Sequence, residues 1–522
     1  MKIVTVEQML AIERAADASG LSYDQMMHNA GLGIGKWIYQ HVPVKHSVIG
    51  LIGSGNNGGD TIIALTWLAK RSVRTTAFLV KQREHDPLLD AYIHQGGAVV
   101  DISNHQHMHV LQAAIIQGAV VLDGVLGTGL KLPLRGTLHQ TMVRISNQLE
   151  NRLDVLKIAV DCPSGVDCDT GEVSDVTFAV DHTLTMAAVK QGLLRHPARS
   201  FSGEIHLIGI GIDEMSDDLN ADFPQMVDEG IIRDFLPQRP DHGHKGTFGT
   251  CLVIAGSAPY TGAAYLTGKS AYRAGCGLVH MAAMKDVHRS LSGRLIEAVW
   301  TILPDVDGAY DPNGVEVIKA DLMSADSIVI GPGWGQNKTN ETFLVALLKS
   351  IPSKTPTLFD ADGLKLLRKL DRWWAHLPNQ TVLTPHPGEM AILTGLDIQE
   401  IQDHRWEIAD EFAQKWNVVL VLKGAVSVIA SPQEGVYVNP VSDSALGTAG
   451  SGDLLSGLIG GLMAQGISAQ GASVLGVWVH GTSGQVAHSV VGTDFSVTAT
   501  DILQHIPHAL LKAKEAGIKT SL

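Results

Sequence analysis

The chain has 522 residues, more than one hydrophobic core usually accommodates, so two or three domains are expected. Its 45% hydrophobic and 18% charged residues are typical of a globular protein in water, and its formal net charge of −14 argues against nucleic acid or an anionic membrane as a partner. Phosphate-bearing ligands stay compatible with this charge, because backbone amides at helix N-termini bind phosphate without basic side chains.

Three features of the sequence predict the cellular location of the protein. No apolar run reaches about 18 residues, so no transmembrane helix is predicted. The start of the chain, MKIVTVEQMLAIERAADASG, carries acids and a helical pattern, which is not the pattern of a signal peptide. The four cysteines form no CxxC pair and are too few for a disulfide scaffold. We therefore expect a cytoplasmic protein.

In the first half, apolar strand-like runs are each followed by a glycine-rich or polar turn. HSVIGLIGSGNNGGD combines a strand and a loop with a helix that is expected to begin near Asp60. GAVVLDGVLGTGL and LKIAVDCPSGVDCDTG repeat this pattern. The alternation predicts a Rossmann-like, doubly wound parallel sheet, in which ligands bind at the carboxyl ends of the strands and these three loops gather.

The three loops carry oxygen-rich side chains. GSGNNGGD (53–60) lacks the GxGxxG spacing of a dinucleotide site, and the oxygens of its asparagines suit an alkali or alkaline-earth cation. Ordinary turn chemistry is the alternative explanation of this loop. The other two loops add Asp123, Asp161 and Ser164. Together they outline a site for a cation and a phosphate.

The alternation lapses around residues 212–240, which are acidic and then interrupted by prolines, and the segment 216–240 is expected to connect two domains. The β/α alternation resumes from Thr250. The predicted strands lie in TCLVIAGS, GLVHMAA, DSIVIGPGWG, TPTLFDADG, QTVLTPHPGE, VVLVLKG, VSVIA and GVYVN. The second half is therefore predicted to be a separate α/β domain that ends in a helix-rich tail.

The segment GTAGSGDLL (447–455) presents one carboxylate, Asp453, where a glycine-rich turn enters a helix. The glycines let backbone amides approach an anion, and the helix dipole points at the same place. Asp453 could then accept a proton from a hydroxyl while a phosphoryl group is transferred. An Asp N-cap on a buried helix is the alternative. The turns VLKG and TPHPGEM add Lys423, His386 and Glu389 as possible ligand contacts.

The order GS…TGA, GPGxG, TPHPGE, KG and GTAGSGD resembles the ribokinase-like family, and more specifically its nucleotide-dependent NAD(P)H-hydrate dehydratases. The resemblance implies that Asp453 deprotonates the substrate hydroxyl and that Ala263, Gly335, His386 and Asp453 contact the hydrated nicotinamide nucleotide. The positions implied to bind the adenine nucleotide are Lys423, Gly424, Ala425, Val426, Ser427 and Gly452.

The implied reaction follows from leaving-group chemistry. A ring hydroxyl leaves poorly, whereas its phosphate ester leaves readily when the enamine nitrogen expels it. The backbone amides of GTAGSG would form the anion hole. ADP is the expected phosphoryl donor, because the fused two-domain arrangement resembles the prokaryotic form, and Mg²⁺ is expected with it.

Residues 1–215 resemble the NAD(P)H-hydrate epimerases through the three loop motifs and DHTLTMAAVKQGLL (181–194). The resemblance implies that Asn57, Asp123 and Ser164 hold K⁺ and that Asp161 is the acid/base. Lys190 is expected to be a structural ion partner, with substrate contact as the alternative. Thr61 departs from the family's glycine, which suggests a different helix entry. The implied substrate contacts are Asn56, Asn57, Gly58, Gly59, Asp60, Gly127, Thr128, Gly129, Leu130, Lys131, Leu132, Pro133 and Asp161.

The two resemblances predict an epimerase domain (1–215), a linker region (216–240) and an ADP-dependent dehydratase domain (241–522). Together the domains would epimerise the R and S hydrates of NADH and NADPH and then dehydrate the S form. The substrates are small molecules, neither nucleic acid nor a membrane is expected as a partner, and a homo-oligomer is expected. The alternatives are a small-alcohol or vitamin-precursor kinase with an N-terminal nucleotide-binding module, and a first half that only senses nucleotides.

Overall fold

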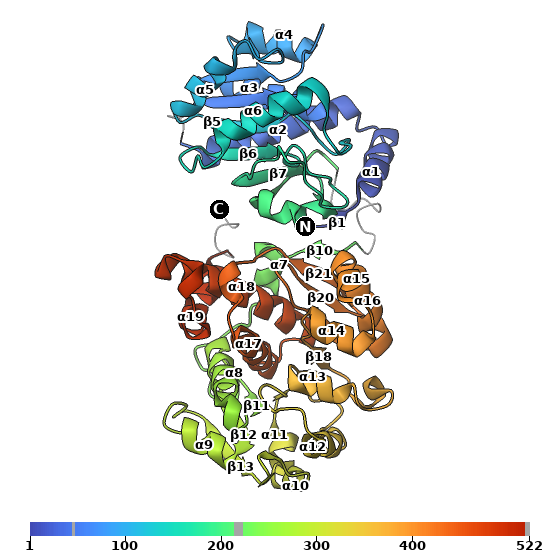
Figure 1. Ribbon diagram of the computed structural model, residues 1–522, viewed down its shortest axis with the longest axis vertical. Helices are drawn as coiled ribbons and strands as arrows, with labels where there is room; N and C mark the ends of the chain where they lie inside the picture. The colour runs from blue at the N-terminus through green and yellow to red at the C-terminus, as the bar shows by residue number, and fades with distance from the viewer. Residues whose placement is uncertain (44–46, 213–222, 517–522) are drawn as a thin grey trace. The chain divides into compact units, whose positions relative to one another are not determined.

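The computed structural model describes residues 1–43, 47–212 and 223–516. The chain divides into two compact units, Met1–Phe223 and Pro224–Leu522, and each unit has its own sheet (Figure 1). In the part of the chain that the structure describes, no helix is long and apolar enough to cross a membrane.

The first unit is built on a seven-stranded sheet with the order β4-β3-β2-β5-β6-β7-β9, and every neighbouring pair is parallel. Helices connect most of the consecutive strands, as a parallel sheet requires. The elements of this unit are β1 (Ile3–Val4), α1 (Val6–Ala18), α2 (Tyr23–His41), β2 (Val48–Ile52), α3 (Asn56–Ala69), β3 (Thr75–Leu79), α4 (Pro87–His94), β4 (Ala98–Asp101), α5 (Met108–Ile116), β5 (Val120–Gly124), α6 (Gly136–Leu149), β6 (Lys157–Val160), β7 (His182–Met186), β8 (Val189–Lys190) and β9 (Glu204–Ile208).

Both faces of this sheet are covered by helices. Val48 and Ile52 of β2 belong to a core that includes residues of α1, α2, α3 and α4. Their neighbours Ile49 and Leu51 belong to a second core, with residues of α5 and α6. Successive side chains of a strand point to opposite faces, so a strand buried on both sides is a continuous apolar run such as VIGLI. The predicted doubly wound parallel sheet is confirmed.

The second unit has a ten-stranded sheet with the order β10-β21-β20-β19-β18-β17-β16-β11-β12-β13, in which only the β19–β20 and β20–β21 pairs are antiparallel. Its strands are β10 (Gln225–Met226), β11 (Thr250–Ile254), β12 (Leu278–Met284), β13 (Val299–Leu303), β16 (Ser327–Ile330), β17 (Thr357–Phe359), β18 (Thr381–Leu383), β19 (Val419–Leu422), β20 (Ser427–Ser431) and β21 (Gly435–Asn439), beside the hairpin β14 (Asp305–Val306) and β15 (Ala309–Tyr310).

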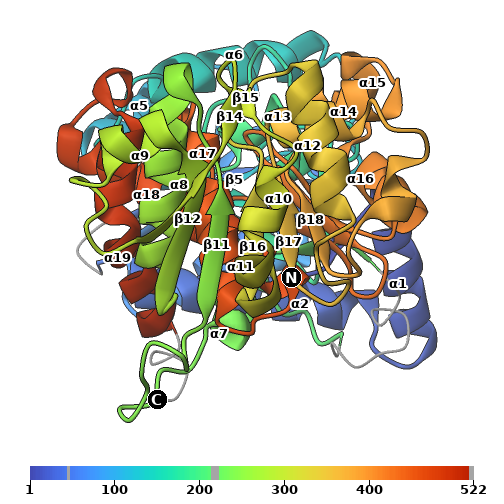
Figure 2. The same ribbon diagram turned by 90° about the horizontal axis from the view of Figure 1, so that it is seen from below.

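Helices α8, α17, α18 and α19 cover one face of the ten-stranded sheet, where their apolar residues share a core with the strands. Helix α16 packs against β19 and β20, and Figure 2 shows it on the opposite flank from α8, α18 and α19. The helices of this unit are α7 (Glu229–Phe235), α8 (Thr261–Ala274), α9 (Lys285–Leu291), α10 (Gly314–Val317), α11 (Lys319–Ser324), α12 (Lys338–Leu348), α13 (Asp362–Leu367), α14 (Pro387–Thr394), α15 (Ile398–Asp403), α16 (Arg405–Trp416), α17 (Ser451–Ala464), α18 (Ala469–Val491) and α19 (Ala499–Ala516).

Two expectations differ from the structure. Helix α3 begins at Asn56 and not near Asp60, so NNGGD forms its first turn and Gly55 is its N-cap. Of the expected linker 216–240, residues 216–222 lie outside the described residues. Residues 224–240 belong to the second unit, where β10 pairs with β21 and α7 buries Ile232. The strand pairing of β10 and the burial of Ile232 place this segment in the second unit. The prolines around it obscured this strand and helix in the sequence.

Candidate active sites

The three residues expected to hold a cation are joined through the backbone of Leu126. Asn57 Nδ2 donates to the carbonyls of Leu126 at 3.2 Å and Val160 at 2.7 Å. The Leu126 N–H donates to Ser164 Oγ at 2.9 Å. Ser164 in turn donates from Oγ and from its N–H to the two carboxylate oxygens of Asp123, at 2.5 and 2.8 Å. The structure therefore brings Asn57, Asp123 and Ser164 together beside the carboxyl ends of β5 and β6.

The Asp123 carboxyl is buried without a cationic partner among the described residues. Only 1% of the residue is exposed, and burial raises its pKa, although hydrogen bonds from Ser164 and Val125 lower it. A buried carboxylate without a counter-charge costs stability. A hard cation would supply that charge, and the carboxylate and amide oxygens of Asp123 and Asn57 are ligands of the type such cations prefer. The residues present therefore fit an alkali cation.

Asp161 follows β6 in the left-handed region, with φ +67°. Its Oδ1 accepts hydrogen bonds from Lys190 Nζ at 2.5 Å and from Thr185 Oγ1 and the Met186 N–H at 3.1 Å each. Within the described ranges, Oδ2 receives no hydrogen bond from the protein and is the oxygen available to a ligand. Lys190 is 1% exposed and is the ion partner of Asp161, which agrees with the expectation of a structural role.

The carboxyl of Asp60 is buried close to that of Asp161. Burial raises the pKa of Asp60 well above its usual value, and the charges of Asp161 and Glu13 raise it further against the opposing effect of Lys190. Burial also raises the pKa of Glu13, which reaches this cluster from α1. Glu13 was not predicted from the sequence, because nothing in a polar N-terminal helix shows that one of its acids faces a distant strand end.

The two glycine-rich substrate segments occupy different structures. Asn56–Asp60 form the first turn of α3, and Gly127–Pro133 form the partly exposed loop after β5. Thr61 continues α3 with its Oγ1 donating to the Asn57 carbonyl at 2.7 Å, so the helix entry requires no left-handed residue there. Arg83, which the sequence analysis did not single out, donates to the carbonyls of Gly53 and Gly55 beside this helix end, at 2.7 and 3.0 Å.

In the second unit, Asp453 lies in the first turn of α17, after Gly450 in the left-handed region. Burial and the neighbouring charges of Asp360 and Asp362 raise the pKa of Asp453 to about 7, against the opposing effect of Lys423. A carboxyl with this pKa exchanges its proton near neutral pH, which is the property of an efficient general base. The N-cap alternative is not supported, because Gly450 occupies the cap position.

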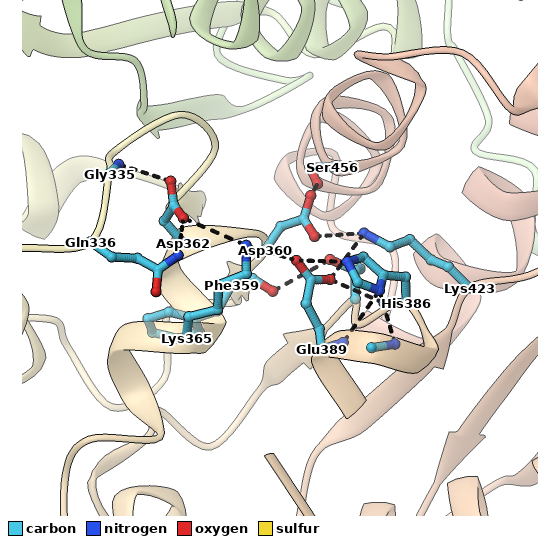
Figure 3. Close-up of polar contacts among 12 residues, drawn as sticks. Gly335, Gln336, Phe359, Asp360, Asp362, Lys365, His386, Glu389, Lys423 and Ser456 are labelled. Atoms are coloured by element: carbon cyan, nitrogen blue, oxygen red, sulfur yellow. Dashed lines mark hydrogen bonds and ion pairs between the residues drawn. The ribbon is translucent and has the colours of Figure 1, made fainter. Parts of the chain in front are cut away.

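A partly buried ion pair lies next to Asp453. Lys423 Nζ donates to Asp360 Oδ1 at 2.8 Å, and Ser456 Oγ donates to Asp360 Oδ2 at 2.6 Å (Figure 3). Burial lowers the pKa of Lys423, but the charges of Asp360, Glu389 and Asp453 outweigh this effect and raise it. The ammonium therefore stays charged at the carboxyl edge of the sheet, where an anionic ligand would meet it.

His386 is the N-cap of α14. Its Nδ1 accepts hydrogen bonds from the N–H groups of Gly388 and Glu389 at 3.0 and 3.2 Å, and Nε2 lies 3.5 Å from Glu389 Oε1 (Figure 3). Burial lowers the pKa of His386, and nearby Lys423 lowers it further, against the effect of Glu389. The two hydrogen bonds to Nδ1 fix the orientation of the neutral ring. Because 53% of the His386 side chain is exposed, the ring can contact a ligand.

A cavity of about 500 Å³ opens beside these groups. Its lining contains five of the six positions expected to bind the nucleotide, together with His386. The exception is Val426, which is buried with 4% exposure. The apolar lining includes Leu446, Leu455 and Val477, as suits a nucleobase. The expected nucleotide positions in the lining are Lys423, Gly424, Ala425, Ser427 and Gly452.

Two further expected substrate positions, Ala263 and Gly335, are not in the lining of this cavity. Ala263 is in the first turn of α8, next to Gly333, where an added Cβ would come within 2.9 Å of the Ala263 Cβ. The Gly335 N–H donates to Asp362 Oδ2 at 2.8 Å. Asp362 also acts on the pKa of Asp453, so these positions belong to the surroundings of the same carboxyl.

His480 on α18 was missed by the sequence analysis. It lines the cavity, and its Nε2 is buried with no hydrogen-bond partner in the described part of the chain. Burial lowers the pKa of His480 to about 4, so the ring is neutral at physiological pH. A single histidine in the apolar run GVWVHG gives no signal in the sequence, because core histidines have the same pattern.

The comparisons with known proteins cover both units. A family model described as NAD(P)H-hydrate dehydratase matches residues 251–508, and one described as YjeF-related protein N-terminus matches residues 23–192. The bifunctional NAD(P)H-hydrate repair enzyme Nnr of Moorella thermoacetica is 32% identical over 99% of this chain and 98% of its own length. The enzyme of the same name from Escherichia coli is 30% identical over 94% of this chain and 90% of its own.

Among solved structures, the ADP/ATP-dependent NAD(P)H-hydrate dehydratase from Bacillus subtilis, co-crystallised with ATP/Mg²⁺, is 28% identical to this chain. The match covers 56% of this chain and 99% of that one, with a TM-score of 0.47.

Proposed function

From the premise that this chain belongs to the bifunctional NAD(P)H-hydrate repair enzymes, we propose how its residues divide the repair between the two units. The protein epimerises the R and S forms of hydrated NADH and NADPH and dehydrates the hydrate to restore the reduced cofactor. Unit Met1–Phe223 carries the epimerase and unit Pro224–Leu522 the dehydratase. The small-alcohol kinase is not favoured, because the relatives match over both units.

In the first unit, Asp161 and Asp60 would act as a base and an acid on the hydrated ring. The charged Asp161 takes the hydroxyl proton through Oδ2, a C=O bond forms at that carbon, and its bond to the ring nitrogen breaks. Asp60, whose raised pKa favours the protonated carboxyl, gives its proton to the nitrogen. Reclosure on the other face of the carbonyl returns both protons and inverts the centre. The support is the ion pair of Asp161 with Lys190 and the raised pKa of the buried Asp60, which favours the protonated form of that carboxyl.

We further propose that Asn57, Asp123 and Ser164 hold K⁺. When bound, the ion supplies the positive charge that the buried Asp123 lacks among the described residues, and it attracts a substrate phosphate. The support is the hydrogen-bonded chain in which Asn57 and Ser164 both bond to the backbone of Leu126 and Ser164 bonds to Asp123. The segments Asn56–Asp60 and Gly127–Pro133 would bind the rest of the substrate.

In the second unit, Asp453 would take the proton from the ring hydroxyl as the hydroxyl oxygen attacks the terminal phosphorus of the nucleotide. The bond to the leaving nucleotide oxygen breaks, and Lys423 and the amides of the glycine turn hold the negative charge. The ring nitrogen then expels phosphate, and loss of the neighbouring ring proton restores the dihydronicotinamide. The single observation that carries this assignment is the carboxyl of pKa about 7 at the start of α17.

The proposed donor is ADP with Mg²⁺, supported by the fused arrangement of the two units. Lys423–Ser427 and Gly452 would bind the nucleotide in the cavity beside His386. No group of three acidic or histidine ligands gathers at this site in the described part of the chain, so the nucleotide phosphates would supply most of the Mg²⁺ ligands. His386, Ala263 and Gly335 would contact the hydrated substrate.

Cytoplasmic location and assembly into a homo-oligomer also belong to this proposal. All four cysteines are free and buried, which suits a reducing compartment. Light scattering of the purified protein tests the assembly.

The decisive experiment mixes purified protein with R and S NADH hydrate, Mg²⁺ and either ADP or ATP, and follows the near-ultraviolet absorbance of reduced nicotinamide. Full recovery with ADP supports both proposed sites. Recovery with ATP alone refutes ADP as the donor, and recovery of only the S fraction refutes the epimerase assignment. No recovery with either donor would refute the role of Asp453.

A further inference from the structure

Two histidines and a glutamate gather on one face of the first unit's sheet, far from the residues assigned to epimerisation. His182 is the first residue of β7, and Glu204 and His206 lie on the neighbouring edge strand β9. His182 pairs with Glu204 in the parallel register, and residues two apart on a strand share a face. The three side chains therefore project to the same side of the sheet.

Their ligand atoms have the spacing of a metal site. His182 Nδ1 lies 3.0 Å from His206 Nε2, and Glu204 Oε2 lies 3.7 Å and 3.8 Å from these two nitrogens. An ion in the centre of this triangle is about 2.1 Å from all three atoms, which is the usual length of zinc–nitrogen and zinc–oxygen bonds. We propose that His182, Glu204 and His206 bind a divalent transition-metal ion of the zinc class.

The set of donors also selects this class of ion. Two imidazoles and one carboxylate suit Zn²⁺, whereas Mg²⁺ prefers oxygen ligands and binds imidazole poorly. The histidine side chains are each 24% exposed and that of Glu204 is 69% exposed, so an ion can enter and keep water as a fourth ligand. Without metal, one imidazole nitrogen must donate to the other, and the ion would replace that shared proton.

The surroundings favour a stabilising role over a catalytic one. The site is at the beginning of β7, while Asp161 is bonded to Met186 at the opposite end of that strand. A metal bound to both β7 and β9 would fasten the edge strand to the sheet. Trp37 of α2 covers the site, with its ring 5.1 Å from that of His182 and 4.9 Å from that of His206, so its fluorescence should report binding.

Calorimetric titration of the full chain, stripped of metal with a chelator, tests the proposal. We expect one Zn²⁺ per chain, no comparable binding of Mg²⁺, a change in tryptophan fluorescence that Trp37→Phe removes, and a higher unfolding temperature with Zn²⁺. Glu204→Gln should weaken binding roughly tenfold or more. His206→Gln should abolish it, while His94→Ala, at an exposed histidine of α4, should leave it unchanged.

Equal Zn²⁺ affinity in the wild type, Glu204→Gln and His206→Gln would overturn the assignment, as would an absence of binding to the wild type. Circular dichroism of each variant verifies its fold. If His206→Gln does not fold, Glu204→Gln decides, because its largely exposed side chain is replaced by one of nearly the same shape. With K⁺ and Mg²⁺ supplied in both assays, epimerase and dehydratase rates should not differ between the zinc-free and zinc-loaded protein.

Discussion

At the scale of single residues, the charge state of Asp453 determines whether this carboxyl can act as the proposed base of the second unit. Burial and the charges of Asp360 and Asp362 make ionisation of this carboxyl costly, while Lys423 makes it easier. The balance leaves a pKa of about 7, so at neutral pH roughly half of the molecules carry a base that binds a proton far better than an ordinary aspartate.

Dehydration should lose activity as the pH falls through about 7, because only the ionised Asp453 accepts the hydroxyl proton. Below that value kcat/KM is expected to fall about tenfold per pH unit, and above it the rate should level off. Initial rates with S hydrate and saturating donor between about pH 5 and 9 measure this. A rate that is constant down to about pH 5 would contradict the role of Asp453 as the base.

Replacing Asp453 by Asn should reduce dehydration by a factor of about 10² to 10⁴. It should also stabilise the protein above neutral pH. The folded state favours the protonated carboxyl, so this contribution to stability is complete below pH 3.8 and is lost as the pH rises through about 7. Because asparagine never ionises, the variant does not lose this stability as the pH rises.

The measurement for this variant is the difference in unfolding free energy between Asp453→Asn and the wild type, obtained by denaturant titration. With allowance for the partial exposure of the carboxyl, the difference should grow from near zero at about pH 4 to about 2 kcal/mol at about pH 8. A difference that shrinks as the pH rises would show that the pKa of Asp453 is lowered.

At the scale of elements, the Lys190–Asp161 pair connects β8 to the end of β6. Strand β8 is in turn paired with β1, next to the helix that carries Glu13. The charge and orientation of Asp161 therefore depend on segments that are far apart in the chain. A buried pair of this kind fixes the position of the Asp161 carboxylate. It also costs desolvation free energy, because both charged groups have lost their hydration.

Lys190→Met should destabilise the first unit by about 3–5 kcal/mol, because it leaves Asp161 buried without its counter-charge. Adding Asp161→Asn to this variant should restore much of the stability but no epimerase activity. Denaturant titrations of the two single variants and the double variant measure the coupling energy. If the changes in unfolding free energy of the two single variants add up to that of the double variant, the interaction between Lys190 and Asp161 is refuted.

The element α18 contributes His480 to the nucleotide cavity. We expect His480→Ala to raise KM for ADP about tenfold and to change kcat little, since the ring would lose one hydrogen bond to bound nucleotide but does not touch the reacting atoms. Val490→Ala, at an exposed position of the same helix, is the matched control. Unchanged KM in the His480 variant would exclude it from nucleotide binding.

At the scale of the whole molecule, the chain forms two units with separate sheets and cores, and we propose one activity for each. The residues assigned to epimerisation lie within Met1–Phe223, and those assigned to dehydration lie within Pro224–Leu522. Neither set of assigned residues borrows a side chain from the other unit. Each activity should therefore survive the loss of the other.

In the time that the wild type needs to dehydrate the S hydrate present at the start, Asp161→Asn should convert only this S fraction of a hydrate mixture to reduced cofactor. Asp453→Asn should convert none in that time. An equimolar mixture of the two variants should recover the complete absorbance of the reduced cofactor, because free S hydrate formed by one variant is a substrate for the other. Failure of the mixture, with both variants folded, would show that the sites depend on each other.

The sequence by itself determined the fold class of both units. Continuous apolar runs such as VIGLI and SIVI can be distinguished from amphipathic helices by their local pattern alone. They predict parallel strands, and the loops that follow parallel strands lie at the same edge of the sheet. For this reason the three loops that carry Asn57, Asp123 and Ser164 could be grouped without coordinates. The choice of these three residues as cation ligands, and of Asp453 as the base, came from the resemblance to known families. The start of α3 was misplaced, because asparagine and glycine favour turns in isolation and tertiary contacts overrode that preference.

Only the tertiary structure decided the charge states and the partners. Four features all depend on residues that are distant in sequence: the raised pKa of Asp60, the approach of Glu13, the ion pair of Lys423 with Asp360, and the exposure of His480 to a cavity. The same is true of His182, Glu204 and His206, which become neighbours only through strand register. A pKa depends on burial and on nearby charges, and neither is a property of the linear chain.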